Sequence, residues 1–135
     1  MKKINQISAS IFNKLVALMG ENDHLKIDNS DGCFMPIVIE KLGSPSNIGG
    51  QPVQVFSLTH YFKQNGDSVP DPDMTFAQSL YDNNCIWALT YQDQLRYDEA
   101  VFIKDGHWVE NKKLQNDLSV FSGQWLKNIK DQQEL

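Results

Sequence analysis

The sequence predicts one α+β domain in which a meander of five or six antiparallel strands is packed by an N-terminal and a C-terminal amphipathic helix. Two observations lead to this prediction. Apolar residues recur three or four positions apart at both ends of the chain, which is the spacing of a helix with one buried face. Between these segments, short β-type runs are separated by tight-turn dipeptides, which join antiparallel neighbours. A chain of 135 residues can bury a core as one domain, here residues 1–135.

The two helices are the segments with the clearest periodicity. Residues 4–19 end at Gly20, a residue that commonly stops a helix. The last helix begins after Asn111, a suitable N-cap, and contains Gly123, which indicates close packing against a neighbouring element. The predicted buried stripes are Ile4, Ile7, Ile11, Leu15 and Leu18 in the first helix and Leu114, Leu118, Phe121, Trp125 and Ile129 in the last.

The strands are predicted from apolar runs that are bounded by turn residues. Asn65-Gly66 and Asp105-Gly106 are typical of two-residue hairpin turns, and residues 43–50 (GSPSNIGG) have the composition of a loop. Residues 74–80 fit either a strand or a short helix, and we assign a strand. The predicted strands are 24–28, 34–42, 53–62, 74–80, 85–91, 96–104 and 107–110.

The charge distribution bears on the kind of partner. The net charge is −5, which argues against general nucleic-acid binding because phosphate neutralisation needs a basic face. Arg96 is the only arginine, and bidentate recognition of phosphate or guanine depends on arginine. No basic residue lies between Lys63 and Arg96, so this stretch predicts an acidic surface. Its aspartates are Asp67, Asp71, Asp73, Asp82 and Asp93.

The sequence also bears on where the protein works. No apolar run approaches the roughly 20 residues of a membrane span, and residues 1–12 (MKKINQISASIF) lack the unbroken apolar core of a signal peptide. We therefore expect a cytoplasmic protein without membrane association. Cys33 and Cys85 stand among apolar neighbours, so we interpret them as buried free thiols.

The stretch HYFKQNGDSVPDPDM (60–74) allows two interpretations. The first is an elaborate turn whose exposed residues bind a partner; these are Asn65, Gly66, Asp67, Asp71 and Asp73. Such a binding function requires no cofactor.

The second interpretation is a catalytic site. His60 falls on a largely apolar strand face, where a histidine is more often a core residue, but pairing of the neighbouring strand could bring Glu40 close to it. His60 and Glu40 would then serve as acid or base and orienter, with a divalent metal on Asp67, Asp71 and Asp73. A phosphate would be neutralised by a lysine, from Lys41, Lys63 or Lys104.

Three segments resemble a bacterial family of domains of unknown function that plasmids, conjugative elements and phages carry. They are FMPIVIEKL (34–42), SLTHYFKQNGDSVPDPDMTF (57–76) and LQNDLSVFSGQWLKNIKDQQ (114–133). The pattern HYxxQNGDxxxDPxM is the most specific part of this resemblance. It implies a role in the biology of mobile elements and carries no particular activity.

Two functional hypotheses follow. The favoured one is a non-enzymatic accessory protein of a mobile element that binds another protein, such as a host defence or nucleic-acid enzyme, through the acidic surface of residues 64–95. The alternative is a metal-assisted hydrolase of a phosphodiester or nucleotide. Convergence of Glu40, His60 and the aspartates in a cleft would favour the hydrolase, whereas separated, solvated aspartates would favour binding.

Overall fold

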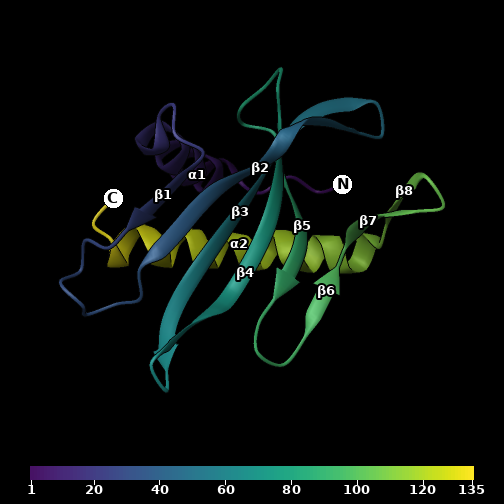
Figure 1. The fold of residues 1–135 in the computed structure, drawn as a ribbon. Coiled ribbons are helices and arrows are strands. Elements are labelled where there is room, and N and C mark those ends of the chain that lie inside the picture. Colours follow the sequence, from purple (N-terminus) through teal and green to yellow (C-terminus); the bar gives the residue numbers. More distant parts are fainter.

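The computed structural model describes the backbone of residues 1–135 and the side chains of residues 1–61, 65–67 and 71–135. Helices lie at both ends of the chain, and strands joined by short connections lie between them (Figure 1). The elements are α1 (Gln6–Met19), β1 (His24–Ile27), β2 (Ile37–Ile48), β3 (Gln51–Gln64), β4 (Asp67–Ser79), β5 (Ile86–Gln92), β6 (Tyr97–Glu99), β7 (Val101–Lys104), β8 (His107–Glu110) and α2 (Lys112–Gln132).

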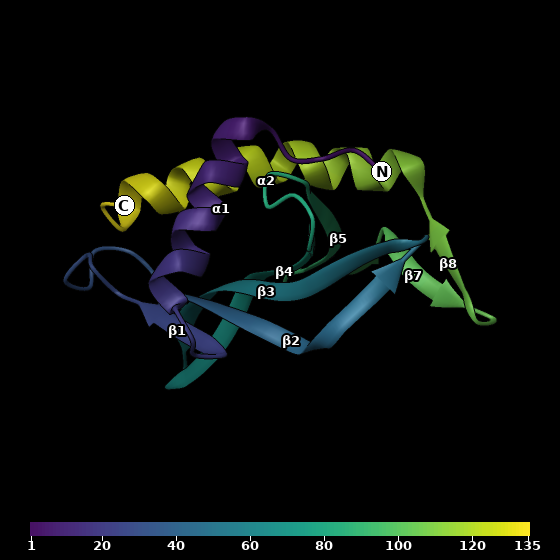
Figure 2. The same cartoon turned by 90° about the horizontal axis from the view of Figure 1, so that it is seen from above.

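The strands form one large sheet and one small one. β1 to β6 pair antiparallel in the order of the chain, and β7 and β8 form a separate hairpin. Both helices lie on the same side of the large sheet, which we call its inner face (Figure 2). The predicted α+β fold with an antiparallel meander is therefore confirmed. In the part of the chain that the structure describes, no helix is long and apolar enough to cross a membrane.

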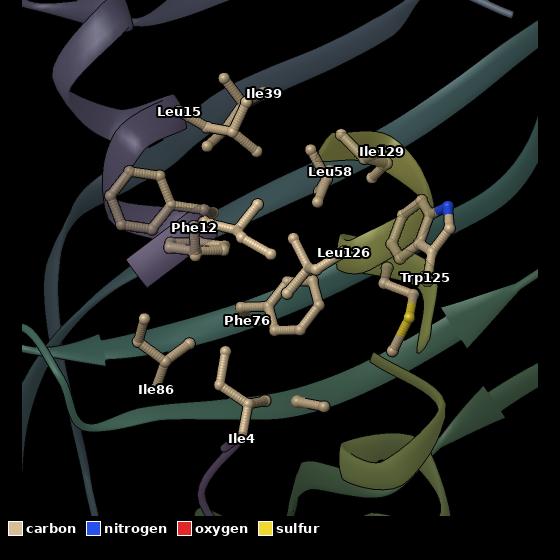
Figure 3. Close-up of a cluster of buried hydrophobic side chains, with 14 of the residues drawn as sticks. Ile4, Phe12, Leu15, Ile39, Leu58, Phe76, Ile86, Trp125, Leu126 and Ile129 are labelled. Carbon is tan, nitrogen blue, oxygen red and sulfur yellow. The ribbon is translucent and has the colours of Figure 1, made fainter. Parts of the chain in front are cut away.

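The main core lies between the inner face and the two helices (Figure 3). Each of β2 to β5 contributes alternate residues to it, such as Ile37 and Ile39 in β2, because alternate side chains of a strand point to the same face. The ring of Phe12 in α1 lies 5.5 Å from that of Phe56 and 5.3 Å from that of Phe76, in the edge-to-face arrangement that aromatic pairs prefer. These three rings hold α1 against the centre of the sheet.

The buried face of α1 differs from the predicted stripe. Ile7 is 74% exposed and Leu18 is 52% exposed, whereas Phe12 and Met19 are buried. The packing of Phe12 on the sheet sets the rotation of the helix, and Ser8 then faces α2. The prediction is therefore wrong at Ile7 and Leu18. The other predicted positions, Ile4, Ile11 and Leu15, are buried.

α2 begins and packs largely as predicted. The Asn111 side chain caps its first turn by accepting a backbone N–H. Phe121 is 39% exposed, so it lies at the margin of the core. A Cβ on Gly123 would lie 2.9 Å from Nδ2 of Asn5 and 3.4 Å from Oγ of Ser8, which confirms that close packing explains this glycine. Leu118, Trp125 and Ile129 are buried, and Leu114 is half-buried.

The two hairpin turns occur where the dipeptides predict them. Asn65 and Gly66 have φ values of 52° and 86°, and Asp105 and Gly106 have values of 52° and 77°. Two successive residues with positive φ are the requirement of a type I′ turn. Residues 74–80 are confirmed as a strand up to Ser79, since they belong to β4.

The predicted loop at residues 43–50 is mostly strand. β2 continues to Ile48, which lies opposite Gln51 of β3, and the chain turns at Gly49 and Gly50. A register shift between Leu42 and Ser46 accommodates the irregular part of this strand. The loop prediction is wrong because pairing with β3 stabilises a strand whose own composition is unfavourable.

The predicted strand 96–104 is divided at Ala100. Its first part pairs with β5, and its second part leaves the large sheet and pairs with β8. The resulting hairpin covers one end of the outer face, where the Trp108 indole donates a 2.7 Å hydrogen bond to the carbonyl of Asn47. Beneath it lies a second apolar cluster, which consists of Ile48, Val53, Ala77, Leu89 and Val101 with Val55 and Trp87 at its margin.

Both cysteines are free, but neither is buried. Cys33 is exposed, and Cys85 is half-buried beside Asp82, whose carboxylate accepts from its thiol at 3.3 Å. The interpretation as buried thiols is therefore wrong, because each cysteine lies in a connection and not in the strands beside it.

Candidate functional site

The outer face of the large sheet carries two rows of side chains that run across all six strands. The rows follow from strand register, since residues directly opposite each other point to the same face. The first row is His24, Glu40, Ser57, Thr75, Thr90 and Glu99. The second row is Lys26, Val38, Thr59, Asp73, Gln92 and Tyr97. Ten of these twelve residues are polar or charged and two, Val38 and Tyr97, are not.

Hydroxyl groups form the centre of this outer face. The hydroxyl oxygens of Thr75 and Thr90 lie 2.6 Å apart across β4 and β5. Thr59 donates a 3.1 Å hydrogen bond to the Asp73 carboxylate across β3 and β4. Threonine is suited to the outer face of a sheet, because its β-branched side chain favours a strand and its hydroxyl can form a hydrogen bond with a residue of the next strand. These two hydrogen bonds fix the side chains of Thr59, Asp73, Thr75 and Thr90 at the centre of the rows.

Carboxylates give the rows their charge. Partial burial raises the pKa of Asp73, the hydrogen bond from Thr59 opposes this rise, and the nearby charge of Glu40 adds to it. Partial burial, together with the charges of Glu99 and Asp73, also raises the pKa of the Tyr97 hydroxyl. Burial is the largest cause of both shifts, and the neighbouring carboxylates add to it.

A two-stranded arm extends from the end of these rows. The pairing of β2 with β3 ends at His60, and the pairing of β4 with β5 begins at Asp73. The intervening hairpin, residues 61–72, therefore continues past both neighbouring strands, as Figure 1 shows at the free ends of β3 and β4. We call residues 61–72 the arm.

The predicted binding residues are distributed along this arm. Asn65, Gly66 and Asp67 form its exposed tip, Asp71 is half-buried along it, and Asp73 lies at its base in the second row. The five residues thus lie on one continuous projection next to the outer face. Lys63, a proposed phosphate-binding lysine, lies outside the described side chains, as does Phe62.

His60 belongs to the core and not to the outer face. Its side chain is 4% exposed, and its Nδ1 accepts a 2.9 Å hydrogen bond from the Trp125 indole. Burial lowers the pKa of His60 to about 4, so the imidazole is neutral near pH 7. Since Nδ1 accepts, the proton is on Nε2, which has no partner among the described side chains.

Glu40 and His60 do not meet. Glu40 is exposed on the outer face opposite Ser57, whereas His60 lies opposite Ile37 and points to the inner face. The sheet separates the two side chains, so the structure does not bring the proposed acid–base pair together. Strand parity explains this outcome, because the register places Glu40 and His60 on alternate faces.

Asp67, Asp71 and Asp73, the residues proposed to hold a metal, do not form a cluster with Glu40 and His60. Among the described side chains, no group of three or more histidine, cysteine, aspartate or glutamate residues is placed to hold a metal ion. Of the other proposed lysines, Lys41 is half-buried and Lys104 lies in the β7–β8 hairpin. The described residues therefore lack the convergent carboxylates that the hydrolase hypothesis requires.

Several residues of the two rows could not be recognised as site residues from the sequence. Thr75, Thr90 and Glu99 carry no motif, and only their register across three strands brings them together. One signal was present, since Ser57 and Thr59 alternate with Phe56 and Leu58 in the predicted strand 53–62. Alternation of hydroxyl and apolar residues is typical of a sheet with one buried and one open face.

A family model described as Domain of unknown function (DUF6908) matches residues 6–135. The matched range starts at the first residue of α1 and includes α2, so it contains every helix and strand described above. No curated protein and no solved structure gives a significant match.

Proposed function

The chain belongs to the family of the Domain of unknown function (DUF6908), and we propose that it is a non-enzymatic module that binds another protein through the outer face and the arm. One observation carries this proposal. Both helices pack on the inner face (Figure 2), so the other face, which carries the two rows, is not covered by a helix. A surface rich in hydroxyl and carboxylate groups is suited to directional contacts with a partner.

The charge of the rows favours a basic partner. The acidic residues are spread across the sheet, with Glu40 in β2, Asp73 in β4 and Glu99 in β6, whereas His24 and Lys26 both lie in the edge strand β1. Complementary potential guides encounter and excludes partners of the wrong charge. A nucleic-acid enzyme with a basic cleft would fit, and the resemblance to mobile-element domains favours a host defence enzyme in the cytoplasm. This mode of action needs no metal or cofactor.

The size of the surface indicates that the arm takes part. Six strands about 4.8 Å apart span roughly 24 Å, and two rows extend about 14 Å along the strands, so the rows cover roughly 300 Å². A stable protein interface needs about 800 Å² per partner. The arm, with its exposed tip at Asn65, Gly66 and Asp67, supplies adjoining surface. We therefore include Asp71 and the tip residues in the proposed interface.

A charge-reversal comparison tests this function. The tagged protein and the double variant Glu40→Arg/Glu99→Arg would be used to capture proteins from the native host, with quantitative mass spectrometry as the readout. The matched control is Glu21→Arg/Asp131→Arg, which makes the same charge change at exposed positions after α1 and in α2. We expect partners retained by the wild type and the control to be lost from the Glu40/Glu99 variant. Equal capture by all three proteins would contradict the proposal.

A further inference from the structure

β6 is the last strand of the large sheet, and one of its edges is free (Figure 1). Along antiparallel strands, residue pairs that exchange backbone hydrogen bonds alternate with pairs that do not. The N–H of Ala100 donates to the carbonyl of Leu89 in β5, so the backbone groups of Asp98 face β5 as well. The backbone groups of Tyr97 and Glu99 therefore point away from β5. In the part of the chain that the structure describes, no strand pairs with them there.

A groove of about 220 Å³ adjoins this edge on the inner face of the sheet. Leu114, Leu118 and Phe121 line it from α2, and Tyr91 adds an aromatic ring from β5. Phe121 is 39% exposed, and its ring is held in an edge-to-face contact with Tyr91, at a distance of 5.4 Å. Asp98 lines the same groove from β6. A strand added at β6 would therefore direct every second side chain to this groove.

The charges at the free edge favour a basic strand. Arg96, Asp98 and Asp117 are the charged residues of the groove, and each already has an ion-pair partner. Glu99 is exposed on the outer face and forms no ion pair with the described side chains. Its neighbour Tyr97 is 55% exposed on the same face, and an aromatic ring attracts cations. A lysine or arginine beside these two residues would therefore gain both contacts.

The same charges disfavour a second copy of this chain at the free edge. Two of the three residues of β6 are acidic. Pairing of all three residues with β6 of a second copy around a two-fold axis would place Asp98 opposite Asp98 of that copy. Like charges directly opposite each other destabilise a strand pair, and both copies carry a net charge of −5. The edge is therefore better suited to a strand of opposite charge.

We propose that the free edge of β6 binds an extended segment of the partner protein in which basic residues alternate with an apolar residue. The segment pairs antiparallel, as all strands of this sheet do. Its basic residues lie opposite Tyr97 and Glu99 on the outer face, and its apolar residue lies opposite Asp98 and contacts the groove. That the segment belongs to a protein partner rests on the proposed function, whereas the edge and the groove do not.

A synthetic peptide tests the edge without any partner. The probe is acetyl-Thr-Lys-Leu-Lys-Thr-amide, which is titrated into isotopically labelled protein and followed by NMR. We expect saturable shifts of the Tyr97 and Glu99 amide signals and slower hydrogen exchange of both amides, because they gain hydrogen bonds. Acetyl-Thr-Glu-Leu-Glu-Thr-amide should not bind. Equal binding of the glutamate peptide, or no saturable shift with the lysine peptide, would overturn the proposal.

N-methylated peptides test the backbone contacts. The residues opposite Tyr97 and Glu99 turn their N–H groups towards β6, whereas the residue opposite Asp98 turns its N–H away. Methylation of both lysine backbone nitrogens should therefore weaken binding about tenfold, and methylation of the leucine nitrogen should change it much less. Replacement of leucine by serine should also weaken binding about tenfold, because the groove loses its apolar contact. Equal affinities of the two methylated peptides would exclude an added strand.

Protein variants test the role of charge. Glu99→Gln should weaken binding of the lysine peptide about threefold, since exposed ion pairs contribute little. Glu21→Gln removes an exposed carboxylate after α1 and should bind as the wild type does. Equal affinities of the two variants would show that Glu99 does not select the basic residues.

Two further outcomes separate this proposal from the alternatives. A dimer of the protein alone, seen by sedimentation velocity and dissociated by the lysine peptide, would assign the edge to a second copy and overturn the proposal. Failure of the peptides with loss of partners in the Glu40/Glu99 capture comparison would overturn only the added strand. Because the peptides need no partner, their binding with unchanged capture would contradict only the proposed function.

Discussion

At the scale of single residues, the environment of His60 determines what this side chain can do. The hydrogen bond from Trp125 occupies Nδ1, so protonation of that atom would break the bond as well as place a charge in the core. A general acid or base needs access to substrate and a pKa near the working pH. With its pKa lowered to about 4 by burial, His60 meets neither condition, and its role is to pair with Trp125.

The lowered pKa of His60 makes stability depend on pH. Below its ordinary pKa of 6.5 the unfolded chain binds a proton that the folded protein excludes until about pH 4, so stability is complete above pH 6.5 and falls as pH decreases towards 4. We expect His60 to account for a loss of about 2 kcal/mol between pH 7 and pH 5. His60→Gln keeps an acceptor for Trp125 without this titration, and urea unfolding at both pH values gives the difference. Identical pH dependence in both proteins would contradict the assignment.

Asp73 has the opposite effect on the pH dependence of stability. Burial raises the pKa of Asp73 in the folded state, so its ionised form opposes folding above that pKa, and the effect disappears as pH falls through it. Asp73→Asn retains an acceptor for Thr59 and removes the repulsion from Glu40. We expect a higher melting temperature than wild type at pH 7, a smaller difference at acidic pH, and weaker partner capture. A lower melting temperature at pH 7 would show that the carboxylate is needed for folding.

At the scale of elements, local chemistry predicts turns and helix ends better than it predicts which face is buried. Asn65-Gly66 turns where expected because positive φ is a property of those two residues. The rotation of α1 was not predictable from its own stripe, since Phe12 takes its position from two rings on other strands. The strand that ends at Ile48 likewise depends on β3, a partner that its own sequence does not reveal.

The crossing of the two helices gives a prediction about Gly123. Alanine should favour the helix by about 1 kcal/mol, but its Cβ would lie 2.9 Å from Nδ2 of Asn5, the residue that caps α1. We expect Gly123→Ala to give no gain in the wild type and a gain of about 1 kcal/mol in Asn5→Ser, which keeps a good cap with a shorter side chain. Urea unfolding of the four proteins of this cycle measures the coupling. Additive effects of the two substitutions would show that the Asn5 side chain does not oppose alanine at position 123.

The tip of the arm gives a second prediction at this scale. At Gly66 a Cβ would meet no atom within 4 Å among the side chains that the structure describes, and the φ of 86° opposes substitution. Gly66→Val should therefore cost about 1–2 kcal/mol and lower the melting temperature, while Gly66→Asn should cost less because asparagine tolerates positive φ. Asp67→Asn changes an exposed side chain and should stay within about 0.5 kcal/mol. Equal melting temperatures for the valine and asparagine variants at Gly66 would contradict this account.

At the scale of the whole molecule, the candidate site is a product of register across strands that are far apart in sequence. Glu40 and Glu99 belong to one row only because four successive strand pairings connect them. The sequence could identify Asp67, Asp71 and Asp73 as candidates in or beside one turn, because turn chemistry is local. It could not place Glu40 and His60 on opposite faces, since a shift of one residue in register would reverse that result.

The whole molecule also depends on α2, which closes the main core and holds the start of the chain. The Gln115 side chain accepts a hydrogen bond from the backbone N–H of Lys2 and donates one to its carbonyl. The helix buries the large apolar side chains of Leu118, Trp125, Leu126 and Ile129. At about 1.5–3 kcal/mol each, these four side chains contribute roughly 6–12 kcal/mol, which is comparable to the total stability of a domain.

A chain truncated after Glu110 should therefore not fold. We expect it to lack a cooperative thermal transition by circular dichroism and to aggregate or sediment as an expanded chain, because the inner face of the sheet would be left open. Trp125→Ala in the full chain is the matched comparison, and it should remain folded while losing about 3–5 kcal/mol in urea unfolding. A truncated chain that melts cooperatively as a monomer would show that the sheet and α1 are stable without α2. The apolar stripe of α2 would then have to serve a partner and not the core.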